Sequence, residues 1–175
     1  MSGTFVSVGN CTQPFPRLLD AIAALAPTLP QPLVVQHGAG SFTLANASAS
    51  ASAFLPMADF EARVANAELL VLHAGAGSVI HAVRAGRMPV VMPRRAALGE
   101  HVDDHQLEFA RALDAAGRVA MAETPADLPA AIARSVARLH GDGGSDPATS
   151  RMLGLVEATL ARYAAEKSGQ SAAWR

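Results

Sequence analysis

The segment from residue 69 to residue 80 has the composition of a turn that binds phosphate. Four apolar residues lead into His73, and a run of small residues, 74–78, then leads into a helical pattern. This order is typical of a buried strand that turns into a helix. Backbone amides at the start of such a helix can face an anion, and glycines let a ligand approach the main chain. We therefore expect residues 73–78 to hold a phosphorylated small molecule, most simply a nucleotide.

This glycine-rich turn matches neither of two common nucleotide-binding motifs. Ile80 stands where the dinucleotide fingerprint has its third glycine, and the chain has no Gly-Lys-Ser/Thr of a P-loop. A tight strand–helix turn without a ligand remains an alternative. In that interpretation Ser78 is only the N-cap of the following helix. In the functional interpretation its hydroxyl also contacts a diphosphate.

A second polar segment, residues 93–106, joins an apolar strand pattern to an amphipathic helix pattern. Asp103 or Asp104 is suited to cap that helix, and Gln106 lies in its first turn, where it can reach ligand hydroxyls. Arg94 or the adjacent Arg95 can meet a phosphate or a sugar carboxylate. The alternative is a solvated loop whose acids only cap the helix.

Three histidines follow or approach strand ends and are the candidate catalytic bases: His37, His73 and His101. His101 and His105 also have the i, i+4 spacing of metal ligands, but His-Glu-x-x-His is absent and Gly99 places His101 near a helix start. We therefore predict no metal site. The single cysteine, Cys11, has no neighbouring base that would make it a nucleophile.

Strand and helix patterns alternate along the chain and predict an α/β fold. The strands are continuous apolar runs, which indicates a parallel, Rossmann-like sheet with helices on both faces. The segment 41–52 has no clear period, and we expect a loop or a short irregular helix there. The predicted strands are 4–8, 33–36, 69–72, 89–93 and 118–121, and the predicted helices are 15–26, 59–66, 79–85, 104–116 and 128–139, the last capped by residues 124–127.

Polar or glycine-rich segments follow four of these strands. In an open α/β sheet the ligand lies beyond the carboxyl ends of the strands. We therefore expect the four segments to meet at one edge: 9–10, 36–38, 73–78 and 94–106.

Composition excludes several classes of protein. Half of the 175 residues are hydrophobic and the formal net charge is −1, which argues against disorder and against a nucleic-acid partner. One cysteine allows no internal disulfide and suits a reducing compartment. No signal peptide or apolar run of about 20 residues is evident, so we expect a cytoplasmic protein. We expect a ligand-binding domain over 1–140, a flexible linker over 141–150, and a C-terminal helix with a frayed tail over 151–175.

Taken together, the motifs resemble the donor-binding C-terminal half of GT-B glycosyltransferases of family 28. The likeness rests on Val8-Gly9, on Val-Val-Gln-His-Gly at 34–38, on His-x-Gly-x-Gly-Ser at 73–78, and on Pro93 leading to Asp-His-Gln at 104–106. It spans roughly residues 4–140. Within the family the chain is most similar to stand-alone subunits of bacterial exopolysaccharide or capsule synthesis. It is also similar to the catalytic subunit of the dolichol-linked N-acetylglucosamine transferase.

The resemblance implies a UDP-sugar donor and no other cofactor. It places the diphosphate on the 73–78 loop, the sugar hydroxyls near Asp104 and Gln106, and Gly9 and Asn10 on the cleft floor. His81 stands where many relatives have a glutamate that binds ribose, and Asn10 where relatives often have threonine. The resulting candidate binding residues are Gly9, Asn10, His73, Gly75, Ala76, Gly77, Ser78, His81, Arg94, Asp104 and Gln106.

The resemblance also implies an inverting, metal-independent transfer in which backbone amides, a helix dipole and an arginine stabilise the leaving UDP. The acceptor and the general base belong to the other half of a GT-B fold. We therefore expect a membrane-anchored partner subunit that binds a lipid-linked oligosaccharide acceptor and holds this chain at the inner face of the cytoplasmic membrane. Two alternatives remain. One is a non-catalytic nucleotide-sugar-binding regulatory module. The other is a UDP-sugar 2-epimerase, which shares the fold but needs both halves in one chain.

Overall fold

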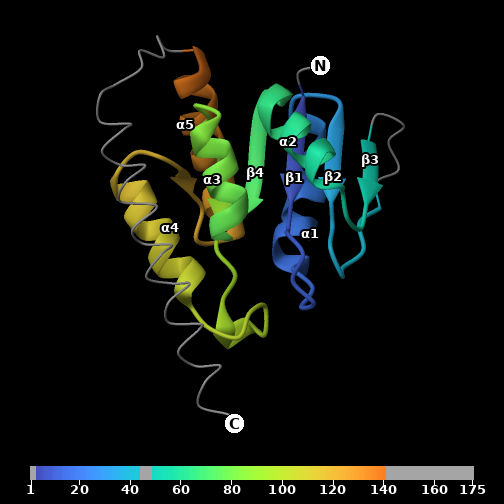
Figure 1. Ribbon diagram of the computed structural model, residues 1–175, viewed down its shortest axis with the longest axis vertical. Coiled ribbons are helices and arrows are strands. Elements are labelled where there is room, and N and C mark those ends of the chain that lie inside the picture. Colours follow the sequence, from blue (N-terminus) through green and yellow to red (C-terminus); the bar gives the residue numbers. More distant parts are fainter. Residues whose placement is uncertain (1–2, 44–48, 141–175) are drawn as a thin grey trace. The chain divides into compact units, whose positions relative to one another are not determined.

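Six parallel strands form the centre of the structure, in the order β3-β2-β1-β4-β5-β6 (Figure 1). The computed structural model describes residues 3–43 and 49–140. All neighbouring strands run parallel, as expected when helices connect them. The strands are β1 (Thr4–Ser7), β2 (Leu33–Gln36), β3 (Ala49–Ser52), β4 (Leu69–His73), β5 (Val90–Met92) and β6 (Ala120–Met121).

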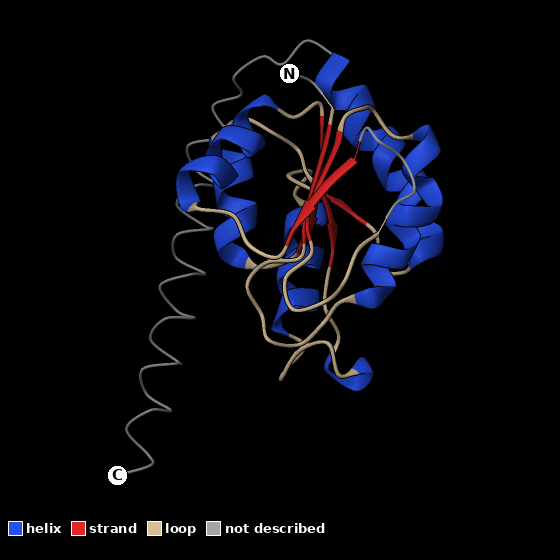
Figure 2. Ribbon diagram, turned by 90° about the vertical axis from the view of Figure 1, so that its right-hand side faces the viewer, coloured by secondary structure: helices blue, strands red, loops and turns tan. Residues whose placement is uncertain are grey.

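Helices cover both faces of this sheet, which Figure 2 shows nearly edge-on. Apolar residues of α1 and α5 pack with alternate strand residues in one cluster that includes Leu18, Ile22 and Leu128. Phe60 of α2 and Val79 of α3 are buried outside that cluster, and α2 contacts α3. The helices are α1 (Pro16–Leu25), α2 (Met57–Asn66), α3 (Ala76–Arg84), α4 (His105–Ala115) and α5 (Leu128–His140), with 3₁₀ turns at Ala26–Thr28, Ala96–Leu98 and Pro125–Asp127.

The central strands are buried at every position. All residues of β1, β2, β4 and β5 are buried, including the polar Ser7, Gln36 and His73 at three carboxyl ends. Layers on both faces explain why these segments read as unbroken apolar runs in the sequence. The three buried polar residues at the carboxyl ends interrupt these apolar runs, and all three lie where a ligand is expected.

Strand β1 is the switch point of the sheet. Ser7 pairs in register with Gln36 of β2 on one side and with Leu72 of β4 on the other. The chain leaves β1 toward β2 and reaches β4 only after β3 and α2, so the connections on the two sides of β1 diverge. In doubly wound sheets the crevice outside such a point is where ligands bind.

The α/β prediction is confirmed, with several local corrections. Strand β3 lies in the segment expected to be a loop or irregular helix, because parallel pairing with β2 forms a strand from alanines and serines of low strand propensity. Helix α3 begins at Ala76, so Ser78 is its third residue and the N-cap is Gly75. The capping box of Thr124 and Asp127 is present as predicted. The predicted linker and C-terminal helix lie outside the described residues.

None of the helices in the described ranges is both long and apolar enough to cross a bilayer.

Candidate active site

A cavity of about 400 Å³ lies at the carboxyl ends of β1, β2 and β4, at the switch point. Eight of the predicted binding residues line it: Gly9, Asn10, His73, Gly75, Ala76, Gly77, Ser78 and His81. Five further lining residues were not among the predicted binding residues: Ser7, Gln36, Leu55, Met57 and Phe60. A polar residue at the end of a buried strand is a sequence signal that identifies Ser7 and Gln36. The three apolar residues carry no such signal, because apolar residues before and within a helix ordinarily indicate core packing.

The first turn of α3 forms the amide-rich end of the cavity. Its N-cap, Gly75, has extended backbone (φ −71°, ψ 128°) and supplies no side-chain cap. The amides of the first turn have no partner within a helix and carry its positive partial charge. A Cβ atom added at Gly77 would meet nothing within 4 Å, so open space lies in front of this turn. The turn is therefore built to receive an anion.

Two glycines confine the imidazole of His73. A Cβ atom at Gly9 or at Gly75 would overlap the ring. Gly9 also has φ +75°, a conformation that other residues rarely adopt. The loops after β1 and β4 thus both pack against this ring. The ring fills the space that a side chain at position 9 or 75 would occupy, so only glycine fits at these two positions.

Burial keeps His73 uncharged. Desolvation, with a smaller contribution from the positive charge of Arg94, lowers its pKa to about 4, and the Ser7 backbone only partly opposes the shift. Nδ1 of the ring has no hydrogen-bond partner of ordinary geometry among the described residues. At neutral pH His73 is therefore a neutral imidazole, too weak a base to abstract a proton efficiently.

Three polar side chains that line the cavity form a hydrogen-bonded chain. The Ser7 hydroxyl donates to Oε1 of Gln36 over 3.1 Å, and Nε2 of Gln36 donates to Oδ1 of Asn10 over 2.9 Å. The amide of Gly9 donates to the Ser7 hydroxyl oxygen over 3.2 Å. Ser7 and Gln36 are buried, whereas Asn10 is exposed in the cavity. This series of hydrogen bonds therefore links the interior of the sheet to Asn10, whose side chain a ligand can reach.

A second wall of the cavity comes from α2 and the residues before it. Leu55, Met57 and Phe60 make this wall apolar. The Phe60 ring meets the ring of His81 edge to face, with centroids 6.1 Å apart. Nδ1 of His81 lies 3.5 Å from Oε1 of Glu61 on α2, so a carboxylate orients the imidazole. A flat, partly apolar group fits against such a wall.

Arg94 lies elsewhere than the sequence suggested. Its side chain is fully buried, stacks 4.7 Å from the Phe15 ring, and donates to the carbonyls of Val8, Gln13 and Glu100 at 2.8–2.9 Å. The expected contact with a phosphate is not supported, because no surface of this guanidinium faces the cavity. Arg94 instead joins the loop after β1 to the loop after β5.

The rest of the second polar segment also holds that loop together. Oδ1 of Asp104 accepts from the Ala96 amide at 2.8 Å, and Oε1 of Gln106 accepts from the Arg94 amide at 3.2 Å. Neither residue lines the cavity. Asp104 stands at the N-cap position of α4 without a capping side-chain bond. Oδ1 of Asp103 instead accepts from the amide of His105, the first residue of α4, at 3.2 Å, so of the two predicted capping acids Asp103 is the one that bonds the helix start. Contact of Asp104 and Gln106 with sugar hydroxyls stays a prediction.

The other two candidate bases, His37 and His101, are held by local interactions. Nδ1 of His37 bonds the Gly40 carbonyl at 2.8 Å, and Nδ1 of His101 lies 3.0 Å from Oδ1 of Asp103. Neither lines the cavity. Within residues 3–43 and 49–140 no group of three or more His, Cys, Asp or Glu is placed to hold a metal ion.

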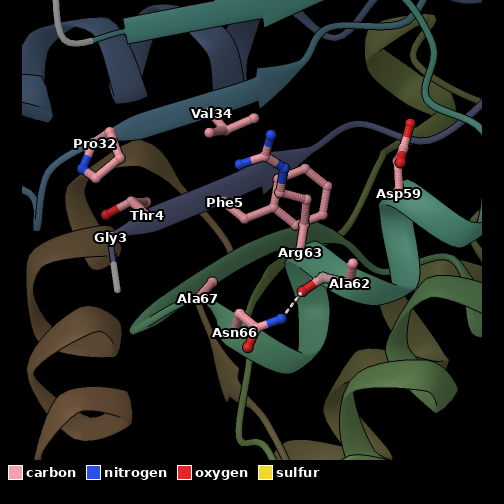
Figure 3. Close-up of a pocket in the computed structure, with 10 residues that line it drawn as sticks. All are labelled: Gly3, Thr4, Phe5, Pro32, Val34, Asp59, Ala62, Arg63, Asn66 and Ala67. Atoms are coloured by element: carbon pink, nitrogen blue, oxygen red, sulfur yellow. Dashed lines mark hydrogen bonds between the residues drawn. The ribbon is translucent and has the colours of Figure 1, made fainter. Parts of the chain in front are cut away.

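A second hollow of about 370 Å³ lies at the opposite, amino ends of β1 and β2 (Figure 3). In this view the Arg63 guanidinium lies beside Phe5 and Val34, while Asp59 points away from them. Thr4 and Phe5, which begin β1, line this hollow together with Gly3, the residue before the strand. Because ligands of open α/β sheets bind at the carboxyl ends, we do not assign the active site to this hollow.

The model of the "Glycosyltransferase family 28 C-terminal domain" matches residues 4–140. The chain belongs to this family. The matched range includes all of the cavity residues and ends where the description of the fold ends. No curated protein matches the family 28 chain.

Solved glycosyltransferases share the fold of this family 28 domain. The "Glycotransferase of kitacinnamycin" aligns with a TM-score of 0.60 and 23% identity over 90% of this chain and 39% of its own. "CalG4, the Calicheamicin Glycosyltransferase" aligns with a TM-score of 0.53 and 22% identity over 92% of this chain and 44% of its own. The chain thus spans about two fifths of the length of these structures. Its fold matches the C-terminal half of GT-B glycosyltransferases.

Proposed function

We propose that this domain binds the UDP-sugar donor of a glycosyltransferase and presents it for transfer to a lipid-linked polysaccharide intermediate. The observation that carries the proposal is the open, uncapped first turn of α3 at the switch point of the sheet. Its amides meet the diphosphate, and their partial charge stabilises the negative charge that develops on UDP as the glycosidic bond breaks. A metal ion is not needed for this role, and the transfer inverts the sugar configuration.

The two ends of the cavity support a nucleoside diphosphate over a bare phosphate. The amide end suits the diphosphate, and the apolar wall of Leu55, Met57 and Phe60 suits the nucleoside. His81, oriented by Glu61, faces the same space and can hydrogen-bond a ribose hydroxyl. This pair takes the part that a glutamate at position 81 plays in many relatives.

The acceptor and its base are proposed to come from a partner subunit at the membrane. Only one predicted base, His73, lines the cavity, and its pKa of about 4 makes it a poor proton acceptor. The same observation favours a second candidate function, a nucleotide-sugar-binding regulatory module without turnover. Transfer of radiolabelled sugar to membranes containing the partner distinguishes the two, because only the enzyme subunit increases the labelled lipid.

Calorimetry with UDP, ADP and GDP tests the donor site. We expect UDP to bind more tightly than the other two. In Gly77→Asp the added side chain enters open space at a helix start, so the domain still folds, but its carboxylate repels the diphosphate. We expect at least a tenfold loss of UDP affinity in Gly77→Asp and a much smaller loss in the isosteric, neutral Gly77→Asn. Equal losses in the two variants, or no nucleotide binding by the wild type, contradict the proposal.

A further inference from the structure

We propose that Gln36 is a positioning residue, which turns the side-chain amide of Asn10 so that its NH₂ group donates to an anionic oxygen of the ligand. The inference rests on the proposed function, since it describes how one wall of the same anion site is oriented. Gln36 is 3% exposed and is bonded at both ends of its amide, to Ser7 and to Asn10. It therefore acts through Asn10.

The backbone amide of Gly9 determines the direction of this chain. A backbone N–H can only donate, and it donates to the Ser7 hydroxyl oxygen. If the Gln36 amide were reversed, its NH₂ would also donate to that oxygen, and the buried Ser7 proton would lose its acceptor. A buried donor without a partner is strongly unfavourable, because it has lost its hydrogen bonds to water and gained none in return. The arrangement with Ser7 donating to Gln36, and Gln36 donating to Asn10, leaves no buried side-chain oxygen or nitrogen of Ser7 or Gln36 without a hydrogen-bond partner.

The direction of these hydrogen bonds determines whether Asn10 presents a donor or an acceptor to a ligand. Its Oδ1 accepts from Gln36, so its Nδ2 carries the hydrogens that remain for a ligand. Asn10 adjoins Gly9, which packs against His73 beside the first turn of α3. An outward-facing donor next to uncapped helix amides complements phosphate oxygens, whereas a reversed amide would present an oxygen and repel them.

A double-mutant cycle tests the inference with UDP and with inorganic pyrophosphate as ligands. Gln36→Met keeps the length of the side chain in β2 and removes both hydrogen bonds, and Asn10→Ala removes the donor itself. We expect each single variant to bind UDP three- to tenfold more weakly. The double variant should be no weaker than Asn10→Ala, because Gln36 acts only through Asn10. Thermal unfolding of every variant checks that the fold is kept.

Side-chain amide signals in ¹⁵N NMR provide a second readout in wild-type protein without ligand. We expect slow hydrogen exchange for the Gln36 NH₂ and fast exchange for the Asn10 NH₂, with the Asn10 signals shifting on addition of pyrophosphate. Independent, multiplying losses in the cycle, or fast exchange at Gln36, overturn the inference and leave the proposed function intact. Pyrophosphate binding with no preference for UDP overturns the proposed function alone, and absence of binding by either ligand overturns both.

Discussion

Acidification should destabilise this domain through the buried imidazole of His73. The ring is confined between Gly9 and Gly75, and its pKa is about 4, against an ordinary value of 6.5. The unfolded chain therefore binds more protons than the folded one between these two values. Stability from this residue is fully present above pH 6.5, falls as the pH decreases toward 4, and changes no further below that.

The magnitude follows from the size of the shift. Each pKa unit corresponds to about 1.4 kcal/mol, so the difference between 6.5 and about 4 is worth about 3 kcal/mol over the whole window. That is a large share of the roughly 5–15 kcal/mol by which domains are stable. It should dominate the pH dependence in a range where exposed carboxylates contribute little.

Urea unfolding followed by far-UV circular dichroism at pH 7.5, 6.5, 5.5 and 4.5 measures this effect. His73→Gln cannot titrate in this range, so its free energy of unfolding should fall by about 2–3 kcal/mol less than that of the wild type between pH 7.5 and 4.5. His105→Gln is the matched control, because the His105 side chain is 46% exposed, and it should follow the wild type.

The reasoning is refuted if wild type and His73→Gln lose the same stability on acidification. Should His73→Gln not fold, the imidazole signals of the wild-type protein in NMR decide the question. We expect the His73 signals to show no titration above pH 5, and a midpoint near 6.5 for that residue would disprove its burial.

Two further predictions concern packing around the site. A methyl group at Gly75 overlaps the His73 ring, whereas one at Gly77 meets open space. In urea titrations Gly75→Ala should therefore lower the free energy of unfolding by about 1–3 kcal/mol, and Gly77→Ala should leave it unchanged or raise it by up to about 1 kcal/mol. Equal effects of the two substitutions would contradict the packing described. By the same measurement Arg94→Met should lower the free energy of unfolding by about 3–5 kcal/mol, because it leaves buried carbonyls unpaired. The Arg95 side chain is 36% exposed, so Arg95→Met should change that free energy by no more than about 0.5 kcal/mol. A mild effect of Arg94→Met would show that the stability of the loop does not depend on this side chain.

Local patterns predicted most of the strands and helices because those patterns report burial directly. Residues 33–36 form β2 as predicted, and the helix after Phe15-Pro16 begins at Pro16. Strand β3 escaped prediction because alanine and serine have little intrinsic preference for strands, and only pairing with β2 makes them one. The start of α3 was placed late because glycine and alanine give no apolar period there.

The candidate site was predicted in part for a similar reason. Glycines and small residues after a strand identify a loop that a ligand can approach, and the 73–78 loop does line the cavity. The apolar wall from α2 was missed, because its residues look like core residues until the fold turns them toward an open space. Arg94 was misplaced because a charged residue near a strand end looks available, although burial and carbonyl contacts occupy it.

By itself, the order of residues determined that this chain forms a parallel α/β sheet with a glycine-rich turn beyond a buried strand, since hydrophobic period and glycine position act over a few neighbouring residues. Only the tertiary structure decided which polar groups share one cavity. Asn10, Gln36 and His73 come together because β1 pairs with β2 and β4 at once, and Arg94 is drawn inside because carbonyls from two distant loops surround it. Contacts between residues far apart in sequence depend on the whole sheet, and no local pattern contains them.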